Sequence, residues 1–432
     1  MKRVAFYTLG CKVNQYDTEA MMKEFEEAGY KILDFEEESD IYIINTCTVT
    51  GQGASKSRKI TRRAKRRNPE ALVGVVGCYP QVDAQEVLDM EEVDFALGTK
   101  GRKKIVEYAQ QAMSAKDQLN FVQEMGEEDI FEEVSIEESK DRTRATVKIQ
   151  EGCEQFCSYC IIPYARGNLR SRGVEDVRAE VARLAQGGFK EIVLTGIHLG
   201  QYGADKKDLD LAKLLKVILP IEGIERIRLS SIEGTEVNDD LIDLISQSDK
   251  LCRHLHLPLQ SGSDKILKAM NRPYNIKEFK DMVYKIRDKV PDIAITTDVI
   301  VGFPGESDKD FEDTYKVLEE LKFSDGHIFK YSKRKGTPAA SYSNQVHSEV
   351  KKDRSRRLRS LVDSLAKDYK ESFIGKEVEV LLELERDRKS NLLTGLTDNY
   401  LRVFVDGEDE LKGELVKVKL LEKEGDLIGE LE

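Results

Sequence analysis

Three short apolar runs in the first third of the chain each end in a cysteine, and helical segments separate them. The runs RVAFYTLGC, DIYIINTC and ALVGVVGC end at Cys11, Cys47 and Cys78. This alternation predicts βα units and a parallel sheet. The carboxyl ends of parallel strands share one edge, so we expect the three thiols to converge there. A lone cysteine at such a place is most often a small core residue, but three equivalent ones favour a shared ligand.

A second cysteine group lies in one loop, EGCEQFCSYC, with the spacing C-x3-C-x2-C. Its members are Cys153, Cys157 and Cys160. Structural zinc takes four ligands, and the residues around the loop offer no histidine or aspartate to complete the set. Three thiolates can instead hold three irons of a cubane cluster and leave the fourth iron open. Zinc with a distant fourth ligand is the alternative that the spacing leaves open.

The middle of the chain repeats a strand-like run and a helical segment about six times, as in RATVKIQ, EIVLTGIH and IAITTDVIVGF. This predicts a partial (β/α)6 barrel over residues 141–370, short of the usual eight units. Active sites of such barrels form at the carboxyl ends of the strands. The polar groups at these ends are the cysteine loop, His198, Glu233, Gln260, Asp298 and residues 330–335.

Two other patterns complete the predicted organisation. The parallel-sheet α/β domain covers residues 1–115, and an acidic, poorly periodic linker follows over residues 116–140. The tail, residues 371–432, alternates apolar and polar residues between turn signals, which predicts a small antiparallel β-barrel. Such barrels often bind nucleic acid, although the excess of acidic over basic residues in this tail weakens that inference.

Cysteine usage and hydropathy favour a cytoplasmic protein. The cysteines number seven, and neither a secretion signal nor an apolar run of about 20 residues is present. An odd count in such a chain argues against a disulfide framework and leaves thiols available for metal. We therefore expect a cytoplasmic location and no membrane partner.

The net charge of −12 disfavours a nucleic-acid partner, but the charge is unevenly spread. The run KSRKITRRAKRR holds eight basic residues and no acid, and KKDRSRRLR is a second basic run. Screening confines the field of each patch to roughly 10 Å, so a local basic face can bind phosphate on an acidic protein. The candidates for RNA contact are Lys56, Arg58, Arg62 and Arg63. A solvated helix face is the alternative.

Six ordered motifs resemble those of the radical S-adenosylmethionine methylthiotransferases. They are TLGCKVNQYDTE, INTCTVT, VVGCYPQ, EGCEQFCSYCIIPYARGNLRSR, HLHLPLQSGSDKILKAMNRPY and DVIVGFPGE. The resemblance covers nearly the whole chain, and the tail is similar to the TRAM domain of that family. It implies two 4Fe-4S clusters, one on the cysteine loop and one on Cys11, Cys47 and Cys78. It also implies S-adenosylmethionine as cofactor, and no catalytic residue is assigned beyond the cluster ligands.

The resemblance further implies a transferase that inserts a methylated sulfur into an aromatic C–H bond. GCKVN with NTCTVT resembles the type that acts at C2 of N6-threonylcarbamoyladenosine at position 37 of tRNA. The partners expected are the tRNA anticodon loop, a reductant such as flavodoxin or ferredoxin, and a sulfur donor. Alternatives within the family act on isopentenyladenosine in tRNA or on a ribosomal-protein aspartate. A non-catalytic zinc- or RNA-binding protein is the alternative of another class.

Other residues match the family by weaker signals. The cofactor-binding candidates are Tyr159, Gly196, His198, Glu233, Gln260, Ser261, Asp298 and Gly302. A structural histidine, a surface glutamate and a turn glycine are the alternatives for His198, Glu233 and Gly302. The arginines that follow the cysteine loop are Arg166, Arg170 and Arg172. They are candidates for RNA phosphate or for the carboxylate of the modified base, because a guanidinium binds carboxylate with two hydrogen bonds.

Overall fold

The computed structural model describes residues 2–48, 51–126, 130–132 and 142–431. The chain forms two compact units. Unit 1 comprises residues 1–137, 150–172 and 332–340, and unit 2 comprises residues 138–149, 173–331 and 341–432. Both cysteine groups therefore belong to unit 1, whereas the predicted strand-end residues from His198 to Gly302 belong to unit 2.

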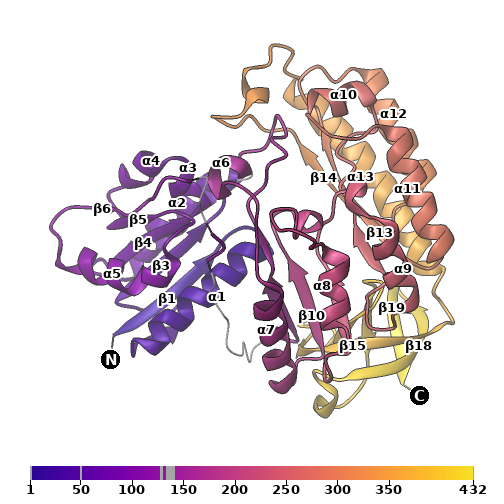
Figure 1. Cartoon of the computed structure of the whole chain (residues 1–432), viewed down its shortest axis with the longest axis horizontal. Coiled ribbons are helices and arrows are strands. Elements are labelled where there is room, and N and C mark those ends of the chain that lie inside the picture. The colour runs from indigo at the N-terminus through magenta and orange to yellow at the C-terminus, as the bar shows by residue number, and fades with distance from the viewer. Residues whose placement is uncertain (1, 49–50, 127–129, 133–141, 432) are drawn as a thin grey trace. The chain divides into compact units, whose positions relative to one another are not determined.

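Unit 1 is built on a parallel six-stranded sheet with the order β2-β1-β3-β4-β5-β6 (Figure 1). The strands are β1 (Arg3–Thr8), β2 (Lys31–Leu33), β3 (Ile41–Thr46), β4 (Leu72–Gly77), β5 (Phe95–Leu97) and β6 (Leu119–Asn120). The helices are α1 (Lys12–Glu27), α2 (Gly51–Arg67), α3 (Cys78–Val82), α4 (Ala84–Leu88), η1 (Arg102–Lys104) and α5 (Ile105–Ser114). This confirms the parallel α/β fold predicted for the N-terminal part.

Helices cover both faces of this sheet, which explains why its central strands are continuous apolar runs. Phe25 of α1 and Ala109 of α5 pack in one buried cluster with residues of β1, β3, β4 and β5. Ile60 and Ala64 of α2 pack on the other face, in a cluster with Tyr42 and Ile44 of β3. Each of these residues is at most 6% exposed. The sheet is thus a rigid frame for whatever lies at its carboxyl edge.

The segment with the second cysteine group adds short elements to unit 1. They are β8 (Gln150–Glu151), α6 (Ile162–Arg166) and β9 (Arg170–Ser171), and β8 pairs antiparallel with β9. Of the linker predicted over residues 116–140, residues 127–129 and 133–140 lie outside the described residues. The predicted domain boundaries stay a prediction, since the compact units group residues 150–172 with the N-terminal sheet.

Unit 2 contains six parallel strands, each followed by at least one helix (Figure 1). The strands are β7 (Arg144–Lys148), β10 (Glu191–Thr195), β11 (Arg226–Leu229), β12 (His254–His256), β13 (Ala294–Val301) and β14 (Asp325–Lys330). Two three-stranded sheets, β7-β10-β11 and β12-β13-β14, are linked by bridges from Ile227 to Leu251 and from Ser231 to His256. This is the partial barrel that the sequence predicts.

The helices of unit 2 pack on these strands around one large buried cluster. They are α7 (Val174–Gln186), α8 (Leu211–Ile218), α9 (Asp239–Gln247), α10 (Asp264–Ala269), α11 (Ile276–Lys289), α12 (Asp308–Leu321) and α13 (Ser348–Glu371). Single 3₁₀ turns lie in unit 2 at Leu199–Gln201 (η2), Gly234–Glu236 (η3) and Asp409–Leu411 (η5), and a further one, η4 (Pro338–Ser341), has residues 338–340 in unit 1. Among the described residues, no helix has both the length and the apolar character that crossing a bilayer would demand.

The C-terminal part of unit 2 is a closed barrel of five strands with the order β15-β16-β17-β19-β18. The strands are β15 (Glu377–Arg386), β16 (Leu393–Thr397), β17 (Arg402–Val405), β18 (Leu415–Lys423) and β19 (Asp426–Leu431). Closure differs from the predicted antiparallel pattern in one pairing, because β17 and β19 run parallel. The buried Arg228 ties this barrel to β11 by donating to the carbonyl oxygens of Thr397 and Asp398.

Candidate functional site

Cys11, Cys47 and Cys78 lie at the carboxyl edge of the sheet in unit 1. Cys47 and Cys78 directly follow β3 and β4, which pair in register up to Thr46 and Gly77. Cys11 precedes the first residue of α1. A Cβ placed on Gly10 would lie 2.8 Å from Cβ of Cys47, so the Cys11 turn lies against Cys47. The structure thus brings the three strand-end thiols to one edge, as their positions in the sequence suggest.

Cys78 is buried beside an arginine that the sequence assigns to RNA. Nε of Arg166 lies 3.3 Å from Sγ of Cys78, and the Arg166 side chain has no solvent exposure to offer a phosphate. Burial raises the pKa of the Cys78 thiol, and the Arg166 cation opposes that shift. The structure thus places Arg166 in the interior of unit 1, and a role of this residue toward RNA stays a prediction.

The remaining donors of Arg166 go to protein groups from distant parts of unit 1. Nη1 donates to Oδ2 of Asp17 at 2.7 Å and to Oε1 of Glu151 at 2.6 Å, and Nη2 donates to Asn14. Burial disfavours the charge, but Cys78, Asp17 and Glu151 outweigh it and raise the pKa of Arg166. The guanidinium is therefore a fixed positive charge among acidic groups.

A second buried arginine shares the same two carboxylates. Arg102 pairs with Asp17 at 2.6 Å, with Glu151 at 3.2 Å and with the less buried Glu132 at 2.8 Å. Burial disfavours its charge, yet these carboxylates outweigh the effect and raise the pKa of Arg102. We name Asp17, Arg102, Glu151 and Arg166 the buried ion network. Sequence analysis did not select Asp17, Arg102 or Glu151. Asp17 and Glu151 nevertheless lie inside the quoted motifs TLGCKVNQYDTE and EGCEQFCSYCIIPYARGNLRSR.

The second cysteine group is attached to this network through the backbone. The N–H of Cys153 donates to the carbonyl of Gly167, the residue after Arg166, at 3.1 Å. Gly152 has φ of +77°, and a Cβ there would overlap the carbonyl oxygen of Asn168. Only glycine fits this turn, because a side chain would meet both backbone strain and a fixed oxygen. Cys157 is buried, whereas Cys153 and Cys160 are half-buried.

The arrangement of each cysteine group bears on the kind of metal centre that it could hold. Among the described residues, no three histidine, cysteine, aspartate or glutamate side chains are gathered as ligands of one metal ion. An iron–sulfur cluster spreads its thiolates over separate irons, so its ligands lie farther apart than those of zinc. Three thiols at one sheet edge and three in one loop fit the cluster requirement better.

In unit 2, His198 and Glu233, which follow β10 and β11, each contact a neighbouring polar side chain. Nε2 of His198 lies 2.8 Å from Oε1 of Glu236, and both side chains are buried. Glu233 pairs with the buried Arg272. Gly196 follows β10 and is half-buried. Glu236 is thus the kind of partner expected if His198 is a structural histidine rather than a cofactor-binding one.

Asp298, which lies inside β13, is close to two histidines that sequence reasoning did not select. Oδ2 of Asp298 is 3.4 Å from Nε2 of His256, and its Oδ1 is 3.4 Å from Nδ1 of His327. These residues come from β12, β13 and β14, so this cluster of polar side chains spans three adjacent strands. Gln260 has φ of +61°, and its N–H donates to the carbonyl of Asp298 at 2.8 Å.

The other cofactor candidates are distributed over both units. Ser261 is buried, and Gly302, with φ of +71°, donates its N–H to the buried Glu306. Tyr159 is half-buried in the cysteine loop of unit 1. The structure thus brings Gln260 and Asp298 together and leaves Tyr159 in the other compact unit.

Two more arginines assigned to RNA are also buried. Arg170 donates to the carbonyls of Asn168 and Arg166, at 3.1 and 3.0 Å. Nη1 of Arg172 donates to the hydroxyl of Tyr16 at 3.4 Å. Their exposed fractions are 7% and 3%, so the structure places them inside the fold of unit 1.

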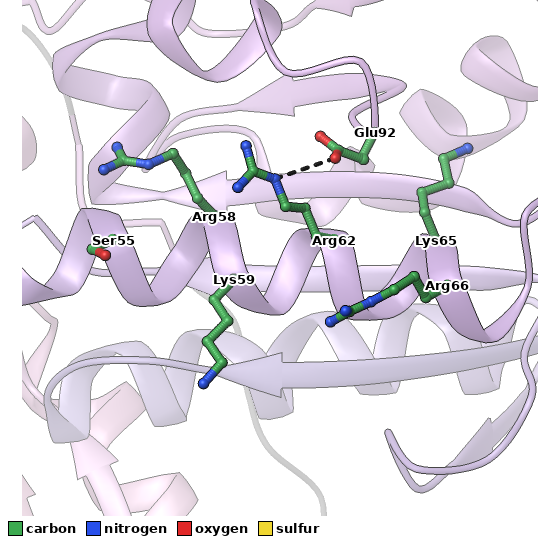
Figure 2. A pocket seen from close by; sticks show the side chains of 7 residues that line it. All are labelled: Ser55, Arg58, Lys59, Arg62, Lys65, Arg66 and Glu92. Atoms are coloured by element: carbon green, nitrogen blue, oxygen red, sulfur yellow. Dashed lines mark ion pairs between the residues drawn. The ribbon is translucent and has the colours of Figure 1, made fainter.

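The basic run around Lys56 forms α2 and lines an open hollow (Figure 2). The hollow has a volume of about 570 Å³ and is lined by Ser55, Arg58, Lys59, Arg62, Lys65, Arg66 and Glu92. Arg58 pairs with Glu86 at 3.0 Å, and Arg62 pairs with Glu92 at 3.3 Å. Lys56 is exposed. Arg63 turns to Glu36, outside the hollow.

Comparisons with known proteins agree with this architecture. The radical SAM superfamily model matches residues 147–318, and that of the Uncharacterized protein family UPF0004 matches residues 3–98. A solved radical S-adenosylmethionine methyltransferase, TsrM from Kitasatospora setae, has a TM-score of 0.59 at 16% identity, covering 79% of this chain and 77% of its own. At that identity the likeness shows the fold.

Two curated relatives match almost end to end. The Threonylcarbamoyladenosine tRNA methylthiotransferase MtaB of Bacillus subtilis is 46% identical over 424 residues, which are 98% of this chain and 94% of the relative. The tRNA-2-methylthio-N(6)-dimethylallyladenosine synthase of Acetivibrio thermocellus is 39% identical over 420 residues, 96% of this chain and 87% of the relative. The chain belongs to the radical SAM methylthiotransferase family.

Proposed function

We propose that this enzyme adds a methylthio group at C2 of N6-threonylcarbamoyladenosine at position 37 of tRNA. The observation that carries the proposal is the higher identity to the threonylcarbamoyladenosine relative than to the dimethylallyladenosine relative, both over nearly full length. The GCKVN and NTCTVT motifs point to the same substrate. Family membership favours this enzyme over the non-catalytic zinc- or RNA-binding alternative. A tRNA substrate would place the reaction in the cytoplasm.

The radical SAM family implies one 4Fe-4S cluster and S-adenosylmethionine. Cys153, Cys157 and Cys160 would hold the cluster, since they match the family's loop and leave one coordination position free. When bound, the cluster and S-adenosylmethionine supply one-electron chemistry that can activate an aromatic C–H bond. The chain's part is to hold this loop rigid: Gly152 sets its entry, and the Cys153 N–H is bound to Gly167.

A second 4Fe-4S cluster is part of the proposal, with Cys11, Cys47 and Cys78 as its ligands. The support is their convergence at one sheet edge. Arg166 would donate to the Cys78 thiolate and offset its charge. Asp17 and Glu151 fix the orientation of that guanidinium.

Unit 2 would supply contacts for S-adenosylmethionine and the substrate base. The Gln260 turn and Asp298 are joined by a backbone hydrogen bond, and Glu233 is held by Arg272. His256 and His327 extend the same polar group over neighbouring strands. These groups can orient polar ligands, because their own positions are fixed by strands and ion pairs. A reductant and a sulfur donor complete the proposed set of partners.

The test is nucleoside mass analysis after an anaerobic reaction with S-adenosylmethionine, a reductant, sulfide and tRNA. Parallel reactions would contain tRNA with threonylcarbamoyladenosine or with isopentenyladenosine. We expect a methylthio mass increase on the first nucleoside, absent in Cys157→Ala. An increase confined to isopentenyladenosine would show that this nucleoside, and not threonylcarbamoyladenosine, is the substrate. No increase on either RNA would leave a protein aspartate as the target to assay.

A further inference from the structure

The basic side chains of α2 fall into rows that differ in their partners. Residues three, four or seven apart share a helix face. Arg58, Arg62 and Lys65 form a paired row, because they pair with Glu86, Glu92 and Asp94 at 3.0, 3.3 and 3.0 Å. Figure 2 shows these three side chains on one side of the helix and Lys59 and Arg66 on the other.

Ser55, Lys59 and Arg66 form an open row along the same hollow. All three are exposed, and Lys59 and Arg66 make no ion pair within the described part of the chain. The two cations lie seven residues apart, which is roughly 10.5 Å along the helix. Their charges are therefore available to a ligand, and a serine hydroxyl beside them can donate a further hydrogen bond.

Arg63 and Arg67 point elsewhere and are held by the same acid. Both pair with Glu36, which follows β2 in the chain. That single carboxylate offsets part of their combined charge. The acids of the paired row are bound to Arg58, Arg62 and Lys65, and not to Lys59 or Arg66. The helix has eight basic side chains, and within the part of the chain that the structure describes the acids that pair with it are Glu36, Glu86, Glu92 and Asp94. The surface as a whole stays positive.

We propose that this hollow binds the phosphate backbone of the RNA substrate, with Lys59 and Arg66 as the phosphate contacts. The inference rests on the proposed function for the partner and adds where that partner is held. A protein partner would need apolar or aromatic anchors, and the lining residues are all polar or charged. Backbone phosphate needs only cations and donors, which is what the open row presents.

Salt dependence of tRNA binding tests this assignment. Each phosphate contact contributes roughly 0.7 to 0.9 to the slope of log affinity against log salt concentration. Binding of full-length protein to tRNA would be followed by fluorescence anisotropy between 50 and 200 mM KCl. We expect Lys59→Gln to lower the slope by about 0.8, and Lys59→Gln with Arg66→Gln by about twice that. Arg63→Gln is the matched control, since it removes one charge from the same helix and should leave the slope unchanged.

Equal slopes for Lys59→Gln and the wild type would overturn the inference, as would an equal reduction in Arg63→Gln. A Lys59→Gln protein that keeps its tRNA slope but loses binding to an acidic ribosomal protein would make the partner a protein. Thermal unfolding would verify that each variant is folded. Failure of the proposed function is separate: it shows as no methylthio product in wild-type protein, whatever the salt slopes are.

Discussion

Arg166 contacts Cys78, and the residue that follows it in the chain, Gly167, contacts Cys153 of the second cysteine group. Its Nε lies 3.3 Å from Sγ of Cys78, and the carbonyl of the next residue, Gly167, accepts a hydrogen bond from the Cys153 N–H at 3.1 Å. A shift of this arginine would therefore displace groups both at the sheet edge and in the cysteine loop. The two proposed cluster sites share one support, which is the buried ion network.

Replacing Arg166 by methionine should strongly destabilise unit 1. The change leaves Asp17 and Glu151 with one cation, Arg102, where they now have two. Loss of one partner from a buried ion pair costs about 3–5 kcal/mol. Urea unfolding of the iron-free protein would measure this. Arg178→Met is the control, because Arg178 pairs with Glu175 at the surface and should cost under about 1 kcal/mol.

Arg166→Met combined with Asp17→Asn would separate charge from packing. The second change removes one of the unpaired carboxylates, so the double variant should be more stable than Arg166→Met by itself. If Arg166→Met unfolds with the wild-type free energy, the network does not stabilise unit 1 as its distances suggest.

Iron content should divide the seven cysteines into three groups. Two four-iron clusters correspond to about eight irons per chain after anaerobic reconstitution. Cys11→Ala and Cys157→Ala should each lower this to about four, because each removes a ligand of a different cluster. Cys252→Ala should keep the full content, since Cys252 is buried in unit 2. Bound zinc without sulfide in the wild type would contradict both cluster assignments.

The sequence predicted those features that depend on local patterns. Apolar runs of strand length and the cysteines after them gave the parallel sheet and its edge, and the βα repeats gave the partial barrel. The interior position of Arg166 was not foreseen, because its partners Asn14 and Asp17 lie 152 and 149 residues away in the chain. Arginine is rarely buried unless it is paired, so a surface role was the natural expectation. No local signal shows such a pairing.

The RNA candidates on α2 show the same limit in another form. Composition identified the basic run, but only the fold shows which cations are already paired. Glu36 is 27 residues from Arg63 and reaches it through the sheet topology. The parallel pairing of β17 with β19 was missed for a similar reason, because alternation of apolar residues does not specify strand direction.

The thiol of Cys252 should make stability fall at alkaline pH. Burial raises its pKa to about 12 from 9.0, although Arg228 opposes the shift. Below about pH 9 the thiol is protonated in both the folded and the unfolded states. Above that, the unfolded state loses the proton first, so stability falls as pH rises toward the folded pKa, by up to about 1.4 kcal/mol per pH unit. Urea unfolding at pH 8, 9 and 10 should show a shallower decline in Cys252→Ala; an identical decline would contradict the prediction.

Gly152 should be more sensitive to substitution than another glycine with the same backbone conformation. Gly152 and Gly188 have φ of +77° and +89°, but an added Cβ would overlap the Asn168 carbonyl at Gly152 and meet nothing within 4 Å at Gly188. Both alanine variants incur the left-handed penalty of about 1–2 kcal/mol, and only Gly152→Ala must also move the loop. We expect Gly152→Ala to lower iron to about four per chain by losing the loop cluster, while Gly188→Ala keeps about eight. Full iron content in Gly152→Ala would show that the turn before Cys153 can relax, and that the rigidity of this loop does not depend on glycine.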